Sequence, residues 1–495
     1  MNNIISLKKQ TSYLFLGKFL SFVIKFLTPV ILVRLISKES FGIYRQFDLI
    51  TSTFIPIFTL GFGSSVLYFY PILAEKIKKN FLFQTYILQF TSGVLLVGVF
   101  YLFSHKIMTW IGITELNSYN ILISLFILFM VISSLNEFYF SVERKIYHNL
   151  IYFPIDSLIR LLLIIFLVSF YKNEKGCIYA ISLYAFIRFL YFTIYSFKNY
   201  SSNKIDISIV KKQIVYSLPL AFSIVITTLI SRVDKFLIVG IVPVEKYAVY
   251  TIAFMGIPLL NELYSSINNI LVPEITKQYF AGNILAVSYL WKKSVEKIAS
   301  VTLPIVLFFV IMSNKIILIL FTASYLEAVP FFKIFLMLYI LFMFNRGIVL
   351  RAANKTLIIL SIDSICFIIT LIVGWFAIPK FLLNGAMFTS CIGVALPICF
   401  KIIFEKSIMK VSIQNWLPWS SLWKIVVSSF IPATIIIILN YYITNNVMAI
   451  LICSIVYISL VFSIQYKLNV FIYMDVIDRN VLITLKKWIW CQSNE

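Results

Sequence analysis

Apolar stretches long enough to cross a membrane recur along the whole chain, from Tyr13 to Tyr466. Each holds about 20 residues, and short charged loops separate them. Because a bilayer's hydrocarbon core is about 30 Å thick, about 20 helical residues cross it. The pattern predicts about fourteen transmembrane helices, with approximate bounds of 11–33, 42–70, 80–103, 118–141, 151–171, 177–197, 213–240, 247–272, 294–312, 328–350, 357–377, 382–402, 420–441 and 446–466.

These fourteen stretches use more than half of the 495 residues and leave no room for a soluble domain. We therefore expect an all-α integral membrane protein, because only helices satisfy their own backbone hydrogen bonds within one segment in lipid. The first stretch, 11–33, is too long for a signal-peptide core, and no small-residue cleavage site follows it. We expect it to remain as a membrane helix.

A short internal repeat relates two parts of the chain. Glu39-Ser-Phe-Gly-Ile-Tyr44 leads into the second span, and Glu245-Lys-Tyr-Ala-Val-Tyr250 leads into the eighth. Six spans separate the copies, so both enter the membrane in the same direction. This predicts two six-helix lobes in a parallel pseudo-two-fold arrangement, with a substrate site between them. We assign 1–200 to the N-terminal lobe, 201–410 to the C-terminal lobe, and 411–495 to two extra spans and a tail.

Composition and charge support a membrane protein and predict its orientation. The chain is 61% hydrophobic and 13% charged, and its net charge is +22. The basic residues lie almost wholly in the loops, 26 in the predicted inner loops and eight in the outer ones. By the positive-inside rule both termini are cytoplasmic, which requires an even number of spans. Because the charge reports orientation, nucleic acid is not an expected partner.

Catalytic signatures are missing from the sequence. No glycine-rich phosphate loop is present, the only histidines, His105 and His148, lie at loop edges, and the six cysteines have no metal-type spacing. The longest predicted outer loops, near 104–117 and 313–327, are about 15 residues long and too short for a membrane-embedded glycan polymerase or ligase. We predict that the protein is not an enzyme and has no metal and no cofactor.

Charged residues inside the spans are the best site candidates, since each costs about 2.5–3.5 kcal/mol at a helix centre unless a partner or water is near. In the first span Lys18, Ser21, Lys25 and Thr28 recur at three- and four-residue steps and form one polar stripe. Lys18 has two alternative explanations. It is close enough to the inner membrane surface for its ammonium group to reach water there, or it lines the lumen. Lys25 is near mid-depth, which favours a water-filled lumen.

The second, fifth and sixth spans carry further charges. Arg45 and Asp48 are three residues apart, and a local ion pair is as good an explanation as a functional role. Asp156 and Arg160 are four apart in the acid-first order, which favours a structural pair. Arg188 has no acid nearby in sequence, so it is the strongest single candidate.

The predicted substrate-binding groups are cations that line a lumen, since the excess of mid-depth positive charge lies in the first half. Such a lumen favours an anion, and phosphate or pyrophosphate suits the forked donors of arginine. The candidates are Lys25, Arg45, Arg160 and Arg188.

Two carboxylates are candidates for binding a coupling ion, H⁺ or Na⁺. Glu262 lies deep in the eighth span, and Asp48 lies near the outer end of the second. Burial favours the neutral form of a carboxyl group unless a cation is close, which suits a proton carrier. The alternative for each is an ion pair with a neighbouring helix.

Several diffuse motifs resemble one known group of transporters. They are Phe19-Leu-Ser, the run from Leu35 to Tyr44, Ser217-Leu-Pro219-Leu, the run from Ser231 to Gly240, Tyr247-Ala-Val-Tyr250, Val272-Pro273 and the run from Leu320 to Ala328. Over roughly residues 5–405 the chain resembles a polysaccharide or O-antigen flippase of the multidrug/oligosaccharidyl-lipid/polysaccharide exporter superfamily.

The resemblance implies a MATE-like V of two lobes that open alternately to each side of a bacterial inner membrane. Such a protein flips an isoprenoid-pyrophosphate-linked oligosaccharide from the cytoplasmic to the outer leaflet for surface polysaccharide biosynthesis. Its partners would be the lipid-linked glycan, membrane lipid, H⁺ or Na⁺, and a polysaccharide polymerase. A cation-coupled multidrug antiporter is the main alternative, although the first span lacks the carboxylates this activity needs. A lipid scramblase or an assembly scaffold is a third alternative.

The charge asymmetry predicts the topology. Reporter tags after Ile4 and after Gln492 should both report the cytoplasm, whereas a tag near Asn445 should report the outer side. Termini found on opposite faces would contradict the even number of spans and, with it, the two-lobe repeat.

Overall fold

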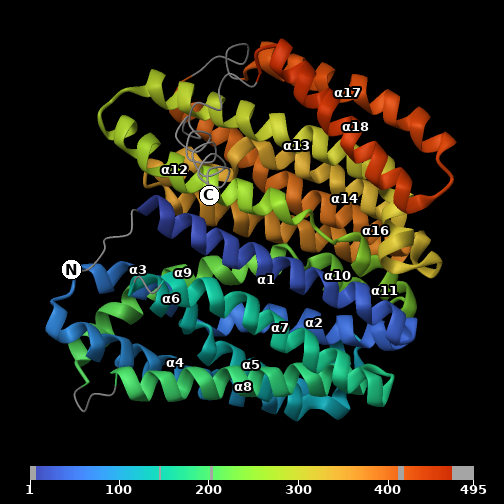
Figure 1. Cartoon of the computed structure of the whole chain (residues 1–495). Coiled ribbons are helices and arrows are strands. Elements are labelled where there is room, and N and C mark those ends of the chain that lie inside the picture. Colours follow the sequence, from blue (N-terminus) through green and yellow to red (C-terminus); the bar gives the residue numbers. More distant parts are fainter. Residues whose placement is uncertain (1–6, 144–145, 201–204, 411–416, 471–495) are drawn as a thin grey trace, which may run out of the picture. The chain divides into compact units, whose positions relative to one another are not determined.

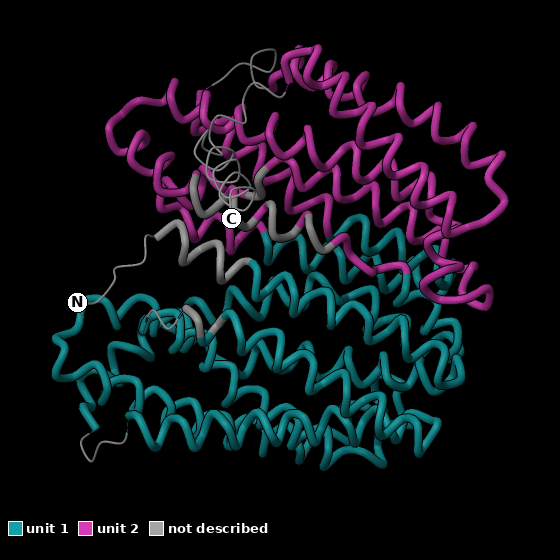
Figure 2. Tube along the Cα trace, in the orientation of Figure 1, with its two compact units in different colours: residues 1–252, 363–393 teal, residues 253–362, 394–495 magenta. Residues whose placement is uncertain are grey.

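The computed structural model describes residues 7–143, 146–200, 205–410 and 417–470. These residues form helices joined by short turns, and no strand occurs among them. The chain divides into two compact units, 1–252 with 363–393 and 253–362 with 394–495 (Figure 2). The proposed lobe boundaries near residues 200 and 410 derive from the repeat and stay a prediction.

The first unit begins at the N-terminus. Its helices are α1 (Leu7–Leu35), α2 (Lys38–Phe58), α3 (Phe62–Phe69), η1 (Tyr70–Ile72), α4 (Glu75–Ile111), η2 (Thr114–Tyr119), α5 (Asn120–Ser133), α6 (Leu135–Val142), α7 (Ile146–Tyr171), α8 (Glu174–Tyr200), α9 (Ile207–Ile230), α10 (Val233–Ile238) and α11 (Val244–Ala253). Within this unit α1 runs along α7, α7 packs on α8, and α2 packs on α5 and α9 (Figure 1).

The second unit holds most of the remaining helices. They are α12 (Pro258–Phe280), α13 (Ile284–Phe321), η3 (Ala323–Ala328), α14 (Val329–Leu341), η4 (Phe342–Gly347), α15 (Ile348–Ala352), α17 (Trp419–Tyr442) and α18 (Asn446–Lys467). Here α13 packs on α12, α14, α17 and α18. The segment α16 (Thr356–Met409), which is two helices joined at a kink at Leu382, contributes residues 363–393 to the first unit and its two ends to the second.

The all-α membrane fold predicted from the sequence is confirmed. Among the described residues, 12 helical stretches are long and apolar enough to cross a membrane, and each of the fourteen predicted spans falls on helix. The number of stretches is smaller than the number of predicted spans for two reasons. The segment α16 contains both predicted spans 357–377 and 382–402, and the predicted span 247–272 is divided between α11 and α12. The chain is a multi-pass membrane protein.

The structure corrects the internal course of several predicted spans. The span 42–70 breaks into α2 and α3 at Leu60 and Gly61, whose φ angles of 48° and 72° are left-handed. The span 213–240 breaks between α9 and α10. The expected turn between the spans 357–377 and 382–402 is present, because α16 consists of two helices joined across a kink at Leu382, whose φ is 47°. A Cβ atom at Gly385 would lie 2.3 Å from the carbonyl oxygen of Ala377, so the second helix folds back on the first. Average hydropathy reports that a segment is apolar and does not report where its backbone breaks.

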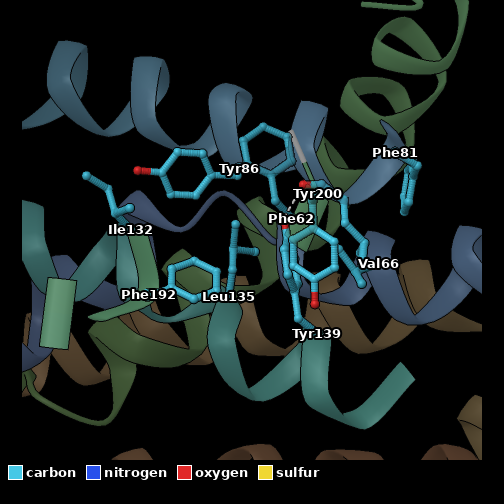
Figure 3. Packing of buried hydrophobic residues seen from close by; sticks show 10 residues of the cluster. Phe62, Val66, Phe81, Tyr86, Ile132, Leu135, Tyr139, Phe192 and Tyr200 are labelled. Carbon is cyan, nitrogen blue, oxygen red and sulfur yellow. Dashed lines mark hydrogen bonds between the residues drawn. The ribbon is translucent and has the colours of Figure 1, made fainter. Parts of the chain in front are cut away.

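An aromatic core joins five helices of the first unit. Residues of α3, α4, α5, α6 and α8 form it (Figure 3), and they are Phe62, Val66, Phe81, Leu82, Tyr86, Ile132, Leu135, Tyr139, Phe192 and Tyr200. The ring centroids of Tyr139 and Phe192 lie 5.4 Å apart in an edge-to-face arrangement. The Tyr139 hydroxyl donates to the Leu82 carbonyl, and Tyr200 donates to Glu143 Oε2 at 2.5 Å. Because the buried hydroxyls are satisfied, this core holds α8 against α4 and α6.

The two copies of the internal repeat lie close together within the first unit. Gly42, in the first copy, sits directly against Val244 at the start of α11, one residue before the second copy. A Cβ atom at residue 42 would lie 2.5 Å from both the carbonyl oxygen and Cγ1 of Val244. Since one of these contacts is backbone, a side-chain rotation cannot relieve it.

This contact predicts that Gly42→Ala destabilises the protein by about 1–3 kcal/mol, the usual cost of overpacking. The measurement is the unfolding temperature of the purified protein in detergent. Gly98→Ala is the matched control, because a Cβ atom at residue 98 meets nothing within 4 Å. It should leave stability unchanged or raise it by up to about 1 kcal/mol. Equal effects of the two substitutions would contradict the steric argument.

Candidate functional site

Five charged side chains from the spans of the first unit share one electrostatic environment. We call Lys25 of α1, Glu137 of α6, Asp156 and Arg160 of α7, and Arg188 of α8 the α1–α8 cluster. The packing of α7 between α1 and α8 brings them together. The hydroxyl oxygens of Ser21 and Ser157 lie 2.5 Å apart and fix the register of α1 on α7.

Arg188 is the buried centre of this cluster, with 9% of its surface exposed. Its Nη1 donates to Asp156 Oδ2 at 3.4 Å and to the Tyr184 hydroxyl at 3.2 Å, while its Nη2 lies 3.9 Å from Glu137 Oε1. Tyr184 in turn donates to Asp156 Oδ2 at 2.7 Å. Two carboxylates therefore compensate the buried guanidinium, as a buried charge requires.

The expected pairing of Asp156 with Arg160 is wrong. Asp156 is 8% exposed and its ion pair is with Arg188 on the next helix. Arg160 lies instead among Tyr44, Tyr184 and Asp48, and its Nε has no partner. Sequence spacing reports pairs on one helix surface only, so it did not reveal the partners that other helices bring to Arg188.

Lys25 has the most exposed side chain among the cations of the α1–α8 cluster. Its side chain is exposed, and the charged groups around it are Asp156, Arg160, Arg188 and Glu137. Among the described residues, none of these carboxylates lies within ion-pair distance of Lys25. Lys18, one stripe position earlier, has its Nζ 5.5 Å from the centroid of the Phe153 ring, a cation–π contact.

Glu137 is a member of the cluster that the sequence reasoning missed. It lies within the predicted span 118–141, so the cost of a charge inside a span was sufficient to nominate it. With Glu137 included, the α1–α8 cluster has three cations and two carboxylates. One positive charge remains uncompensated inside the spans.

Arg45 and Asp48 form the local ion pair that their spacing allows, with Nη1 3.1 Å from Oδ2. Between Ser40 and Thr53, Arg45, Asp48 and Ser52 are the only residues that are not buried. The part of α2 that is not buried between these residues is thus entirely polar, and its three side chains span about two turns. Such a face inside a membrane span needs water or polar groups beside it, because lipid chains offer neither.

The remaining candidate, Glu262, lies on α12 but outside the side chains that the structure describes. No group of three or more histidine, cysteine, aspartate or glutamate side chains suited to a metal ion occurs in the described part of the chain. The substrate-binding and coupling roles assigned to Lys25, Arg45, Asp48, Arg160, Arg188 and Glu262 stay predictions.

Comparison with known families and structures gives a consistent result. A family described as "Polysaccharide biosynthesis protein" matches residues 7–279, more than half of the chain. None of the curated proteins compared with the chain matches it.

Solved structures share the fold at low sequence identity. The lipid II flippase MurJ, in an inward closed conformation, aligns with a TM-score of 0.70 and 17% identity over 94% of this chain and 99% of its own. A multidrug resistance MATE family transporter of the MOP superfamily, facing inward, gives 0.60 and 13% over 78% and 94%. The eukaryotic MATE transporter AtDTX14 gives 0.55 and 14% over 84% and 98%. At these identities the likeness concerns the fold.

The paired environment of Arg188 leads to a stability prediction. Arg188→Ala leaves Asp156 and Glu137 without their cation and should destabilise the protein by about 3–5 kcal/mol. The double variant Arg188→Ala with Asp156→Asn should recover part of this loss, since it removes one unpaired charge. Unfolding temperature in detergent is the measurement.

Lys25→Ala serves as the control for this experiment. It removes a cation that is exposed and makes no ion pair in the described structure, so it should change the unfolding temperature little. If Arg188→Ala is no less stable than Lys25→Ala, the Arg188 pairs do not contribute to stability.

Proposed function

Because this chain belongs to the polysaccharide biosynthesis protein family, we propose that it is a flippase for an isoprenoid-pyrophosphate-linked oligosaccharide. It moves this lipid from the cytoplasmic to the outer leaflet of a bacterial inner membrane by alternating access, with both termini in the cytoplasm. The fold shared with the lipid II flippase MurJ supports the substrate class. The coupling ion, H⁺ or Na⁺, and a polysaccharide polymerase as partner belong to the same proposal.

The uncompensated positive charge of the α1–α8 cluster carries this proposal. A pyrophosphate group cannot cross hydrocarbon alone, so its path needs cations that are accessible and not consumed by ion pairs. Two acids hold Arg188, whereas Lys25 is exposed. We therefore propose Lys25, supported by Arg160, as the group that contacts the anion first, and Arg188 as the buried charge behind it.

The multidrug antiporter is the second candidate function, since MATE transporters share the fold. An antiporter of this kind needs carboxylates that can bind Na⁺, H⁺ or an organic cation. Asp156 and Glu137 are the acids of the α1–α8 cluster, and Arg188 already compensates both. This arrangement favours an anionic substrate.

The proposal predicts the effect of Lys25 variants on export. In a strain that lacks the gene, Lys25→Ala should restore about tenfold less surface polysaccharide than the wild-type chain, while Lys25→Arg should restore most of it. A hydrogen bond to a charged group contributes about 1.5–3 kcal/mol, which is at least about tenfold in binding. Lys175→Ala, at an exposed lysine in the first turn of α8, is the matched control and should export normally.

The deletion strain itself tests the function. It should lose one surface polysaccharide and accumulate lipid-linked repeat units in the inner leaflet. Normal polysaccharide together with increased sensitivity to ethidium would instead support the antiporter. Glycan export by Lys25→Ala at the wild-type level, with equal protein in the membrane, would place the anion site elsewhere.

A further inference from the structure

A second polar path runs along the end of α9 and its C-cap residue, on residues that the α1–α8 cluster does not include. Ser223, Thr227 and Ser231 follow one another at four-residue steps, and the last two are exposed. The Thr227 hydroxyl donates to the Ser223 carbonyl at 2.8 Å, and Ser231 donates to the Thr228 carbonyl at 2.8 Å. Each hydroxyl therefore keeps acceptor capacity on the open side. Arg232 follows directly at the end of this path.

Arg232 meets the open polar face of α2. Its Nη1 donates to Ser52 Oγ at 2.6 Å, and Ser52 Oγ donates to the backbone carbonyl of Asp48. The charged groups around Arg232 include Asp48 and Arg45. Arg45 lies 3.1 Å from Asp48, and their side chains are 25% and 37% exposed. Arg45 thus pairs with the partly exposed carboxylate of Asp48, while Arg232 is held beside it through Ser52 and makes no ion pair with it in the described structure.

The neighbouring acid does not remove the remaining charge. Asp234 is 2% exposed, and it accepts from the Tyr250 hydroxyl at 2.7 Å and pairs with Lys235 at 3.3 Å. Lys235 and Asp234 form a pair that neutralises itself. Arg45, Arg232 and Asp48 therefore leave one net positive charge on an open face inside the spans.

We propose that Arg45 and Arg232 form a second anion site, distinct from the α1–α8 cluster, which binds a phosphate or pyrophosphate group. Asp48 is the carboxylate that now occupies Arg45, and the incoming anion displaces it from Arg45. Forked guanidinium donors suit both a carboxylate and a phosphate, so one can replace the other without leaving a bare cation. This inference rests on the proposed function for its place in transport, as a second stop for the substrate's pyrophosphate.

The two sites have different charged residues around them. Lys25 has Asp156, Arg160, Arg188 and Glu137 around it, whereas Arg45, Asp48 and Asp234 surround Arg232. Arg160 lies between them, since its neighbours include both Tyr184 and Asp48. An anion that leaves the first site therefore has a cation beside it on the way to the second.

The alternative explanation is that Arg45, Asp48 and Arg232 only brace α2 against α9. The two explanations differ in the sign of the Asp48→Asn effect. In an anion site this change removes a competitor and tightens anion binding. In a brace it removes an ion pair, lowers stability and adds no affinity.

The test uses the purified full-length chain in detergent with inorganic pyrophosphate as probe, titrated by calorimetry. Arg232→Ala and Arg45→Ala should each weaken binding about tenfold, since each removes a charge-assisted hydrogen bond to the anion. Arg232→Lys should weaken it less, and Asp48→Asn should strengthen it severalfold. Arg34→Ala, an exposed arginine at the end of α1, is the control and should bind like the wild type.

Two further arms distinguish the source of the phosphate. In nanodiscs of neutral phosphatidylcholine, undecaprenyl pyrophosphate should bind with the same dependence on Arg232 and Asp48. If phosphatidylglycerol displaces pyrophosphate through Arg232 equally well, the site is supported with a lipid headgroup as its ligand.

Three results would overturn the second site. They are unchanged pyrophosphate binding in both arginine variants, weaker binding in Asp48→Asn, and no binding by either the wild type or Asp48→Asn. These results are independent of the deletion strain. If the deletion strain keeps its surface polysaccharide, the proposed function is wrong, but the binding site is not affected by that result. If the deletion strain loses export and both arginine variants bind pyrophosphate normally, only the second site is wrong.

Discussion

The cost of placing a charge in hydrocarbon is the constraint on which the arrangement of the first unit depends. Arg188 is buried between Asp156 and Glu137, and Lys235 is paired with Asp234. The Arg188 pairs join α8 to α6 and α7, and Asp234 of α10 also accepts from Tyr250 of α11, so satisfying these charges also fixes helix positions. The charges that are left over are Lys25, whose side chain is exposed, and those on the partly exposed polar face of α2.

The second unit meets the same constraint with backbone groups. Lys315 of α13 donates to the carbonyls of Asn440 and Ile443, at 3.2 and 2.9 Å, and so satisfies the end of α17. Glu405 is fully buried and accepts from the Val349 amide at 2.7 Å, close to the start of α15. Unsatisfied peptide groups at helix ends are suitable partners for buried charges. The described side chains of this unit contain no cationic centre comparable to the α1–α8 cluster.

The sequence predicted what depends on neighbouring residues and missed what depends on packing. Spans were found because hydropathy accumulates over 20 residues, and the Arg45–Asp48 pair was found because its partners are one helical turn apart. The acidic partners of Arg188 come from α6 and α7, and no spacing along α8 could indicate them. Glu137 was overlooked although it lies within a span. The break at Gly61 is a backbone property that an apolar average conceals.

The contact of Gly42 with Val244 bears on how a duplicated segment changes over time. In the first copy of the repeat a glycine touches the chain that introduces the second copy, while the equivalent residue there, Ala248, is fully buried. A methyl group is thus forbidden in one copy and accommodated in the other. The copies cannot be exchanged, and recombination that made them identical with alanine at both positions would damage the fold. Once this contact existed, selection would act on each half separately and keep their sequences apart.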